Sequence, residues 1–274
     1  MEYLKVILYG IIEGITEWLP ISSTGHLILA EKLLALPYSE EFMSMFRVVI
    51  QLGAILAVVV LYFPRLWPFT TDARHKYQRP EVWQLWFKIL VATLPAMVLG
   101  LLLDDWLDAH LYNYITVAAM LILYGVFFIL IENRHRRPTV RRMDQLTYRH
   151  ALIIGCWQVL AMIPGTSRSG ATIVGGLLLG LARPVAAEFT FFLAIPVMAG
   201  ASGLKLVKFL ADGGTFTGGE VAALALGCAV AFVVSVAAIR FLVSFVQKHD
   251  FKVFGWYRIV LGIVVLVYFY LIAA

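Results

Sequence analysis

Residues 13–26 read EGITEWLPISSTGH and interrupt an apolar N-terminal region with two glutamates, a proline and a run of hydroxyl side chains. A second polar interruption, PGTSRSGAT at residues 164–172, carries an arginine instead of acids. Ionisable groups at bilayer depth cost about 2.5 to 3.5 kcal/mol each on insertion scales and usually mark function. We therefore predict that the two stretches, one acidic and one basic, are the halves of one functional site.

The composition is that of a membrane protein. Of the 274 residues, 61% are hydrophobic and 14% are charged, and the mean hydropathy is +0.86. Soluble domains rarely exceed about half apolar residues, and long apolar segments without strand-like alternation favour helices. Cys156 and Cys228 lie in apolar segments without metal-like spacing, so we expect small buried side chains and infer no disulfide.

Six apolar segments are long enough to cross a bilayer, which takes about 20 residues. Residues 2–36 and 150–182 instead break into two short arms around the polar stretches, and we expect each to be a re-entrant helix–loop–helix hairpin. The predicted fold is an all-α polytopic membrane protein. Its six transmembrane helices are expected near 44–63, 84–104, 114–132, 185–207, 220–244 and 253–273.

The two halves of the chain carry similar residues 145 positions apart, and this spacing superimposes the two polar stretches. The pairs are Gly10 with Gly155, Ser22 with Ser167, Thr24 with Ser169, Gly25 with Gly170, Phe46 with Phe191, and Ala54 with Ala199. We predict two repeats in one integral membrane domain, 1–149 and 150–274, each a hairpin followed by three spans. Because three crossings are an odd number, the second repeat is inverted, an arrangement known from transporters.

The basic residues set the expected orientation. The net charge of +5 could indicate nucleic-acid binding, but we attribute it to basic membrane loops and expect no nucleic acid. The loops 64–83, 133–149 and 245–252 gather basic residues on one side, which the positive-inside rule makes cytoplasmic. Both termini, and the side from which the first hairpin enters, are therefore expected outside.

Glu13 and Glu17 are four residues apart, so on a helix they share one face with Cβ atoms about 6 Å apart. Two carboxylates so close repel each other unless one is protonated or a cation lies between them. A hard divalent ion, Mg²⁺ or alternatively Ca²⁺, suits the pair when substrate oxygens and water complete its shell. The alternative is an acid pair satisfied by hydroxyls or arginine.

The hydroxyl run after Pro20 has two readings. Ser22, Ser23 and Thr24, with main-chain N–H groups at the start of a short helix, could cradle an anion, or they could simply cap that helix. His26 lies three residues beyond Ser23. Its pKa near neutrality suits a general acid–base or a nucleophile.

Arg168 is the centre of the second polar stretch. Its planar, permanently charged fork suits phosphate oxygens, and glycines let backbone amides approach a ligand. Around it lie Ser167, Ser169, Thr172, Gly165 and Gly170. The alternative is an ion pair with Glu13 or Glu17, which is compatible with phosphate binding because an empty site could use that pairing.

Gln51 and Glu188 also lie within predicted spans, either as site residues or as polar groups that pack helices. Taken together, an acid pair, hydroxyls, a histidine and an arginine at the tips of two opposed hairpins suit phosphoryl transfer. A substrate with a phosphate head and a long apolar tail would match such a site.

The chain resembles the bacterial undecaprenyl-diphosphate phosphatase family, also called the bacitracin-resistance protein family. The resemblance covers essentially the whole chain and is carried by EGITEWLPISSTGH at 13–26, VIQLGAILAV at 49–58 and PGTSRSGAT at 164–172. It implies metal-dependent hydrolysis of undecaprenyl diphosphate to undecaprenyl phosphate and inorganic phosphate, in the bacterial cytoplasmic membrane. This reaction recycles the lipid carrier of cell-wall synthesis and removes the target of bacitracin.

By motif match, Glu13 and Glu17 correspond to the acidic, metal-binding pair, with Glu17 also counted as catalytic. Ser23 and His26 correspond to the catalytic candidates and Arg168 to the phosphate-binding arginine. Either Ser23 attacks with His26 as base, or His26 attacks directly. The expected partners are the polyprenyl diphosphate and membrane lipids, and a homo-oligomer is compatible with the sequence. The site is expected to open outward.

Two other functions use similar features. A transporter or lipid flippase could bind a phosphate-headed lipid at the same hairpin tips without cleaving it, and metal-dependent phosphate release would separate the two activities. Type-two phosphatidic acid phosphatases need a histidine six residues after the arginine of their SR motif, where this chain has Val174. A purely structural protein would leave Glu13, Glu17 and Arg168 without a purpose at bilayer depth.

Overall fold

The computed structural model describes residues 2–70, 78–134 and 137–271, without the side chains of 31–33, 104, 105 and 108. Helices form the fold, and this described part contains no strand. The helices are α1 (Glu2–Thr16), α2 (Ser23–Leu33), α3 (Glu40–Val49), α4 (Gln51–Leu66), α5 (Pro80–Leu111), α6 (Tyr114–Asn133), α7 (Tyr148–Val159), α8 (Arg168–Leu178), α9 (Arg183–Ala211), α10 (Gly218–Lys248) and α11 (Lys252–Leu271). Single 3₁₀ turns, η2 (Met143–Gln145) and η3 (Leu160–Met162), flank α7.

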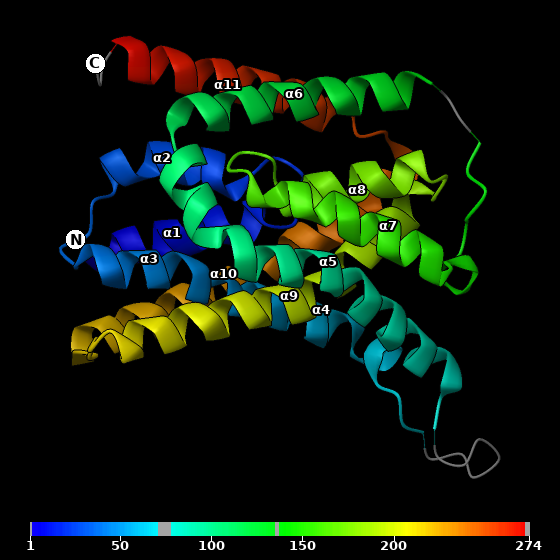
Figure 1. Cartoon of the computed structure of the whole chain (residues 1–274), viewed down its shortest axis with the longest axis horizontal. Helices are drawn as coiled ribbons and strands as arrows, with labels where there is room; N and C mark the ends of the chain where they lie inside the picture. Colours follow the sequence, from blue (N-terminus) through cyan, green and yellow to red (C-terminus); the bar gives the residue numbers. More distant parts are fainter. Residues whose placement is uncertain (1, 71–77, 135–136, 272–274) are drawn as a thin grey trace.

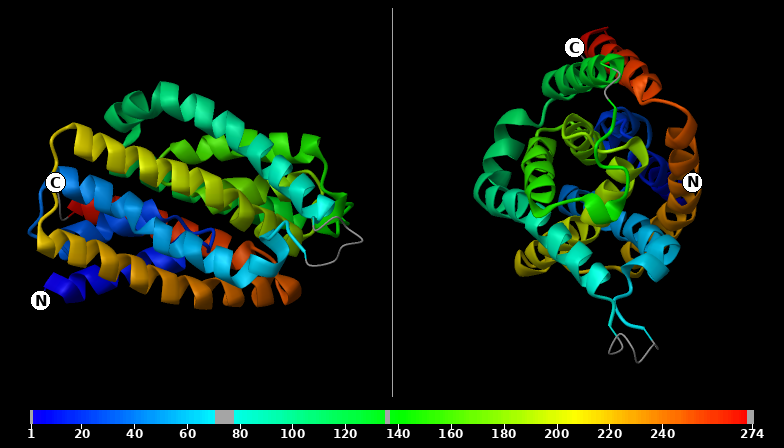
Figure 2. Two further views of the ribbon diagram at one scale, coloured as in Figure 1. Left: turned by 90° about the horizontal axis from the view of Figure 1, so that it is seen from below. Right: turned by 90° about the vertical axis from the view of Figure 1, so that its right-hand side faces the viewer.

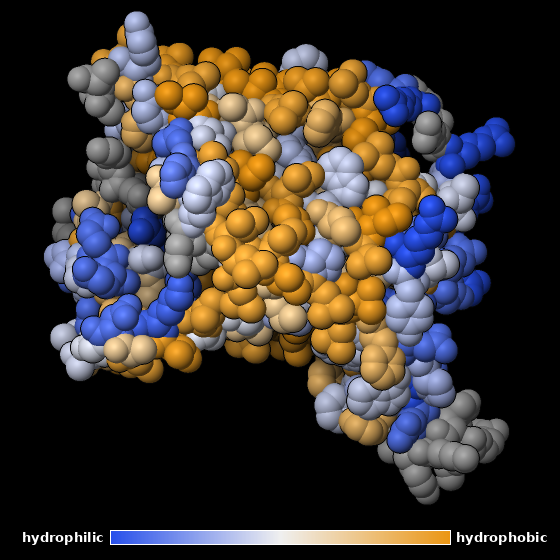
Figure 3. All heavy atoms as spheres, in the orientation of Figure 1, coloured by the Kyte–Doolittle hydropathy of each residue, from blue (hydrophilic) through white to orange (hydrophobic). Residues whose placement is uncertain are grey.

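Six segments of the described chain are long and apolar enough to cross a membrane, as predicted. They are Glu40–Leu66, Pro80–Leu103, Tyr114–Asn133, Arg183–Ala211, Gly218–Lys248 and Lys252–Leu271. Large apolar side chains such as Leu102 and Val233 are exposed on them. In Figure 3 they form a broad apolar band, and hydrophilic residues gather at the two ends of the molecule. The fold is therefore that of a multi-pass helical membrane protein.

Two spans differ in detail from the prediction. The first is interrupted between α3 and α4 at Ile50, which keeps helical dihedral angles (φ −62°, ψ −20°). Gly53 N donates to Ile50 O at 3.1 Å, so the chain tightens by one turn there rather than leaving the helix. The second span was expected to end at residue 104 and its apolar segment ends at Leu103, but its helix α5 continues to Leu111.

The short helices form two hairpins that enter the molecule from opposite ends (Figure 1). α1 runs from the end where the chain begins toward the middle, and α2 returns to that end; α7 and α8 do the same from the other end. Residues 169–176 of α8 are all buried, and the end-on view in Figure 2 shows the long helices around the periphery. This is the geometry that re-entrant hairpins require, and their depth in a membrane stays a prediction.

Helix lengths and contacts support the division into repeats, which also stays a prediction. α2 and α8 each have 11 residues and begin 145 positions apart. Helices of one half pack on helices of the other: α1 on α10, α7 on α5, and α6 on α11. Such an exchange of partners is expected of two copies related by a pseudo-two-fold axis.

The prediction for Cys156 is wrong. α7 turns an apolar stripe outward at helical spacing, with Tyr148 and Leu152 exposed at 47% and 45%, and Cys156 continues that stripe as an exposed free thiol. Cys228 is also free but half-buried, and its Sγ lies 3.6 Å from Val49 O.

We expect Gly53→Ala to weaken the contact between α4 and α10. A Cβ at Gly53 would lie 2.0 Å from the Cys228 carbonyl oxygen, so the backbones must separate, at a cost of about 1–3 kcal/mol or more in the free energy of unfolding. Gly203→Ala on α9 is the control, because a Cβ there meets nothing within 4 Å. The measurement is the thermal unfolding midpoint in detergent; equal midpoints for the two variants would contradict the close packing.

Candidate active site

The acid pair lies at the turn of the first hairpin. α1 ends at Thr16, but Glu17 N still donates to Glu13 O at 3.0 Å. The helical pitch therefore continues and places the two glutamates one turn apart on one side. Glu13 is 0% exposed and Glu17 is 7% exposed.

Both hairpin turns end on a serine in the same conformation. Ser22 and Ser167 both have φ 72°, in the left-handed region where serine is uncommon. Each hydroxyl accepts a hydrogen bond from a glycine N–H three residues later, Gly25 at 3.3 Å and Gly170 at 3.2 Å. These serines cap α2 and α8, which is the structural alternative left open for Ser22.

An ion pair joins the two hairpins. Arg168, the first residue of α8, donates from Nε and Nη2 to Glu17 Oε1 at 3.2 and 3.0 Å. Both side chains are about a tenth exposed, at 11% and 8%. The structure thus contains the ion pair considered from the sequence, with Glu17 as the partner, and it joins the acidic stretch to the basic one.

The other hydroxyls of the second stretch support Arg168 and the turns. Arg168 Nη1 donates to Thr190 O at 3.0 Å, and Thr172 Oγ1 donates to Arg168 O at 2.9 Å while lying 2.8 Å from Thr190 Oγ1. Ser169 Oγ lies 3.1 Å from Ser167 Oγ and 3.4 Å from Leu19 O of the first turn. These contacts orient Arg168 and join the two turns.

Glu13 is buried without a hydrogen bond to any described residue. Neither carboxylate oxygen of this fully buried residue makes a hydrogen bond in the described part of the chain. A buried carboxylate without a partner is costly, and a cation bound between Glu13 and Glu17 would remove that cost. No group of three or more His, Cys, Asp or Glu residues that could hold a metal occurs among the described residues. Two carboxylates completed by substrate oxygens and water suit Mg²⁺.

His26 is held at both ring nitrogens. Nδ1 lies 2.7 Å from Ser22 O, and Nε2 lies 2.7 Å from the Tyr257 hydroxyl of α11. Because a carbonyl only accepts, Nδ1 carries the proton, and in the neutral ring Nε2 accepts from Tyr257. The two rings are also stacked, with centroids 5.6 Å apart.

The remaining predicted residues differ in their surroundings. Ser23 and Thr24 are half-buried at the start of α2, and their hydroxyls make no hydrogen bond to the described residues. Gln51 begins α4 and is half-buried. Glu188 forms an ion pair with Arg65. It therefore does not take part in the Glu17–Arg168 ion pair.

Sequence analysis missed three polar groups around the hairpins. Arg258 of α11 is 0% exposed and contacts both turns, and Tyr257 beside it holds His26. Gln158 of α7 is buried, and neither of its amide atoms has a hydrogen-bond partner among the described residues. It lies 145 positions after Glu13. Arg258 could have been found as an arginine inside a predicted span. Gln158 could have been found from the repeat spacing of 145 residues.

The fold and these contacts define a class: a polytopic helical membrane protein in which two hairpins bring carboxylates, hydroxyls, a histidine and an arginine together in the interior. Residues 6–264 match the family described as Bacitracin resistance protein BacA. The chain belongs to this family.

Curated relatives are similar over nearly their full length. A protein called Undecaprenyl-diphosphatase from Desulfitobacterium hafniense is 60% identical over 272 residues, covering 98% of this chain and 96% of the relative. Proteins of the same name from Enterococcus faecalis and Limosilactobacillus fermentum are 57% and 54% identical. They cover 96% and 100% of this chain, and 96% and 99% of the relatives.

Removing Arg168 is expected to destabilise the protein strongly. Arg168→Met removes the ion-pair partner of the buried Glu17, and breaking a buried ion pair costs about 3–5 kcal/mol. The control Arg65→Met breaks a pair whose arginine is 50% exposed, which is worth about 1 kcal/mol or less. Thermal unfolding of both variants in detergent is the measurement. Equal destabilisation would mean that the hairpin pair does not stabilise the interior.

Proposed function

We propose that this protein hydrolyses undecaprenyl diphosphate to undecaprenyl phosphate and inorganic phosphate, recycling the lipid carrier of cell-wall synthesis and conferring bacitracin resistance. The observation that carries the proposal is the buried ion pair between Glu17 and Arg168, beside the unpartnered Glu13. It joins a guanidinium to an acid pair inside an apolar protein, and a guanidinium suits phosphate oxygens. The names of the relatives support the same reaction.

Arg168 binds the terminal phosphoryl group in this proposal. Its guanidinium fork can exchange the Glu17 carboxylate for phosphate oxygens, which have similar geometry. Glu13 and Glu17 would hold a divalent metal, Mg²⁺ or alternatively Ca²⁺. When bound, the metal supplies positive charge that stabilises the charge developing on the diphosphate. Thr172 and Thr190 keep the arginine oriented through their hydrogen bonds to it.

Ser23 and His26 supply the nucleophile and the base. In one route Ser23 Oγ attacks the terminal phosphorus, His26 Nε2 takes the hydroxyl proton, and undecaprenyl phosphate leaves; water then cleaves the phosphoserine. In the other route His26 Nε2 attacks the terminal phosphorus directly, undecaprenyl phosphate leaves, and water then cleaves the phosphohistidine. In both routes Nε2 must release the Tyr257 hydroxyl, while the hydrogen bond from Nδ1 to Ser22 O keeps the imidazole oriented.

The apolar exterior fits a substrate that stays in the membrane. The polyprenyl tail would lie among membrane lipids, with the diphosphate at the two hairpin turns. We place the protein in the bacterial cytoplasmic membrane with both termini outside and the site open to the outer side. This orientation follows from the basic loops and suits a lipid carrier released there.

Phosphate release from undecaprenyl diphosphate by purified protein in detergent tests the reaction. We expect turnover with Mg²⁺, none with a chelator, and at least about a 100-fold loss in Arg168→Ala, because electrostatic stabilisation of the transition state is worth that much. Arg240→Ala, an exposed site on α10, is the control and should keep full activity. A folded protein that binds the lipid but releases no phosphate would instead favour a transporter.

The nucleophile is tested by Ser23→Ala and His26→Ala in the same assay. If Ser23 attacks, acid-quenched reactions should contain phosphoserine in the unmodified protein and none in Ser23→Ala. If His26 attacks, Ser23→Ala should retain turnover and an acid-labile phosphohistidine should form. Full activity in both variants would exclude both routes.

A further inference from the structure

Arg258 is a cation enclosed by the two hairpin turns. Its side chain is 0% exposed in the middle of the protein. Among the described residues, the guanidinium donates to backbone carbonyls alone: Pro20 O at 3.1 Å, Gly165 O at 2.9 Å, Thr166 O at 2.8 Å, Met120 O at 3.3 Å and Leu121 O at 3.4 Å. Pro20 belongs to the first turn, Gly165 and Thr166 to the second, and the last two residues to α6.

Arg258 has no carboxylate partner in the described part of the chain, in contrast to Arg168. The ring of Tyr124 lies 5.6 Å from its Cζ. A buried charge without an opposite charge is costly, so a simple packing role would be met better by an apolar side chain. What an apolar residue cannot supply is hydrogen bonds to carbonyls that the turns leave unpaired.

These contacts lie next to the residues of the proposed reaction. Pro20 is three residues after Glu17, and Thr166 is two residues before Arg168. A Cβ at Gly170, in the first turn of α8, would be 3.2 Å from Arg258 Nη1. The guanidinium therefore lies directly beside the start of the helix that carries Arg168. The neighbouring Tyr257 holds His26, so one turn of α11 contacts both hairpins.

We propose that Arg258 is a positioning residue: it fixes the two hairpin turns against one another and so holds Arg168 and Glu17 in the arrangement that the reaction needs. The proposal rests on the function proposed above. Arginine is required because five N–H donors in one rigid plane can serve carbonyls from three segments at once. A lysine ammonium keeps the charge but has only three donors at a single point.

Arg258→Lys is the test variant. We expect folded protein with a kcat about 100-fold lower, as for a misplacement of about 1 Å, and a much smaller change in KM. In the double variant with Arg168→Lys, the fold-loss of kcat should be smaller than the product of the two single fold-losses. The reason is that Arg168, once misplaced, contributes little to kcat, so replacing it costs little more. If Arg258→Lys only lowered the folded fraction, the loss of activity in the double variant would equal the product of the two single losses.

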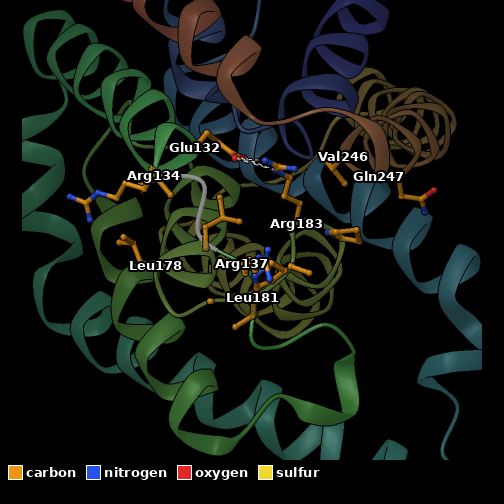
Figure 4. Close-up of a pocket in the computed structure, with 14 residues that line it drawn as sticks. Glu132, Arg134, Arg137, Leu178, Leu181, Arg183, Val246 and Gln247 are labelled. Carbon is orange, nitrogen blue, oxygen red and sulfur yellow. Dashed lines mark hydrogen bonds and ion pairs between the residues drawn. The ribbon is translucent and has the colours of Figure 1, made fainter.

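Arg183→Lys is the matched control. Arg183 forms a two-pronged ion pair with Glu132, at 2.9 and 2.6 Å. Both residues line the pocket in Figure 4, and no described residue of 17–23 or 163–169 lines it. Replacing Arg183 weakens an ion pair that lies outside the turn residues 17–23 and 163–169, so its effect should multiply with that of Arg168→Lys. Wild-type kcat in folded Arg258→Lys, or a fully multiplicative double variant, would overturn the proposal.

Hydrogen exchange gives a readout that does not depend on activity. Backbone amides of residues 17–23 and 163–169 should exchange faster in Arg258→Lys and unchanged in Arg183→Lys. Unaltered exchange at either turn would overturn the positioning role, even if the unmodified protein releases no phosphate. Absence of phosphate release by the unmodified protein, with faster exchange in Arg258→Lys, would overturn the proposed reaction alone.

Gly170→Ala is the second variant if Arg258→Lys does not fold. The added methyl group crowds the guanidinium without removing it, so kcat should fall several-fold and the loss should be coupled to that of Arg168→Lys. Gly203→Ala on α9 is its control, because a Cβ there meets nothing within 4 Å. Equal kcat in both glycine variants would count against Arg258 as a positioning residue.

Discussion

Peptide groups that leave a helix inside an apolar molecule must find partners, and this requirement governs the centre of the protein. The chain breaks its helices around residues 17–22 and 163–167, where water cannot satisfy the backbone. Ser22 and Ser167 satisfy N–H groups of α2 and α8, and Arg258 satisfies carbonyls of both turns. Each unsatisfied group would cost several kcal/mol in hydrocarbon surroundings, so the turns exist only in this arrangement of partners.

The same arrangement distributes charge between the hairpins. The first turn supplies Glu13 and Glu17, the second supplies Arg168, and α11 supplies Arg258, so the formal charges of the four buried groups cancel. Neither hairpin alone has this balance. The two turns and α11 thus bring both signs of charge to one place, which suits a ligand that carries both a cation and phosphate oxygens.

The spans and the polar breaks could be predicted because they are local in sequence: length and hydropathy identify the first, and Pro20 or Pro164 with neighbouring polar residues identifies the second. The partners could not be predicted in the same way. Pairing Arg168 with Glu17 was one of several alternatives, and the contact of Glu188 with Arg65 depends on how α4 and α9 pack. The outward direction of Cys156 depends likewise on which face of α7 meets α5. Tertiary packing determines these contacts, and the hydrophobic periodicity of the sequence does not predict them.

The proposed reaction brings a cation and an anion to one place, and the ion pair between Glu17 and Arg168 has a thermodynamic consequence for their binding. A cation on Glu17 takes a partner from Arg168, and a phosphate on Arg168 takes a partner from Glu17. The first ligand to bind must separate the ion pair and bears the free-energy cost of that separation. The second ligand then binds without that cost. Linkage makes this coupling equal in both directions, and the resting ion pair therefore acts as a filter that favours the two ligands together over either one alone.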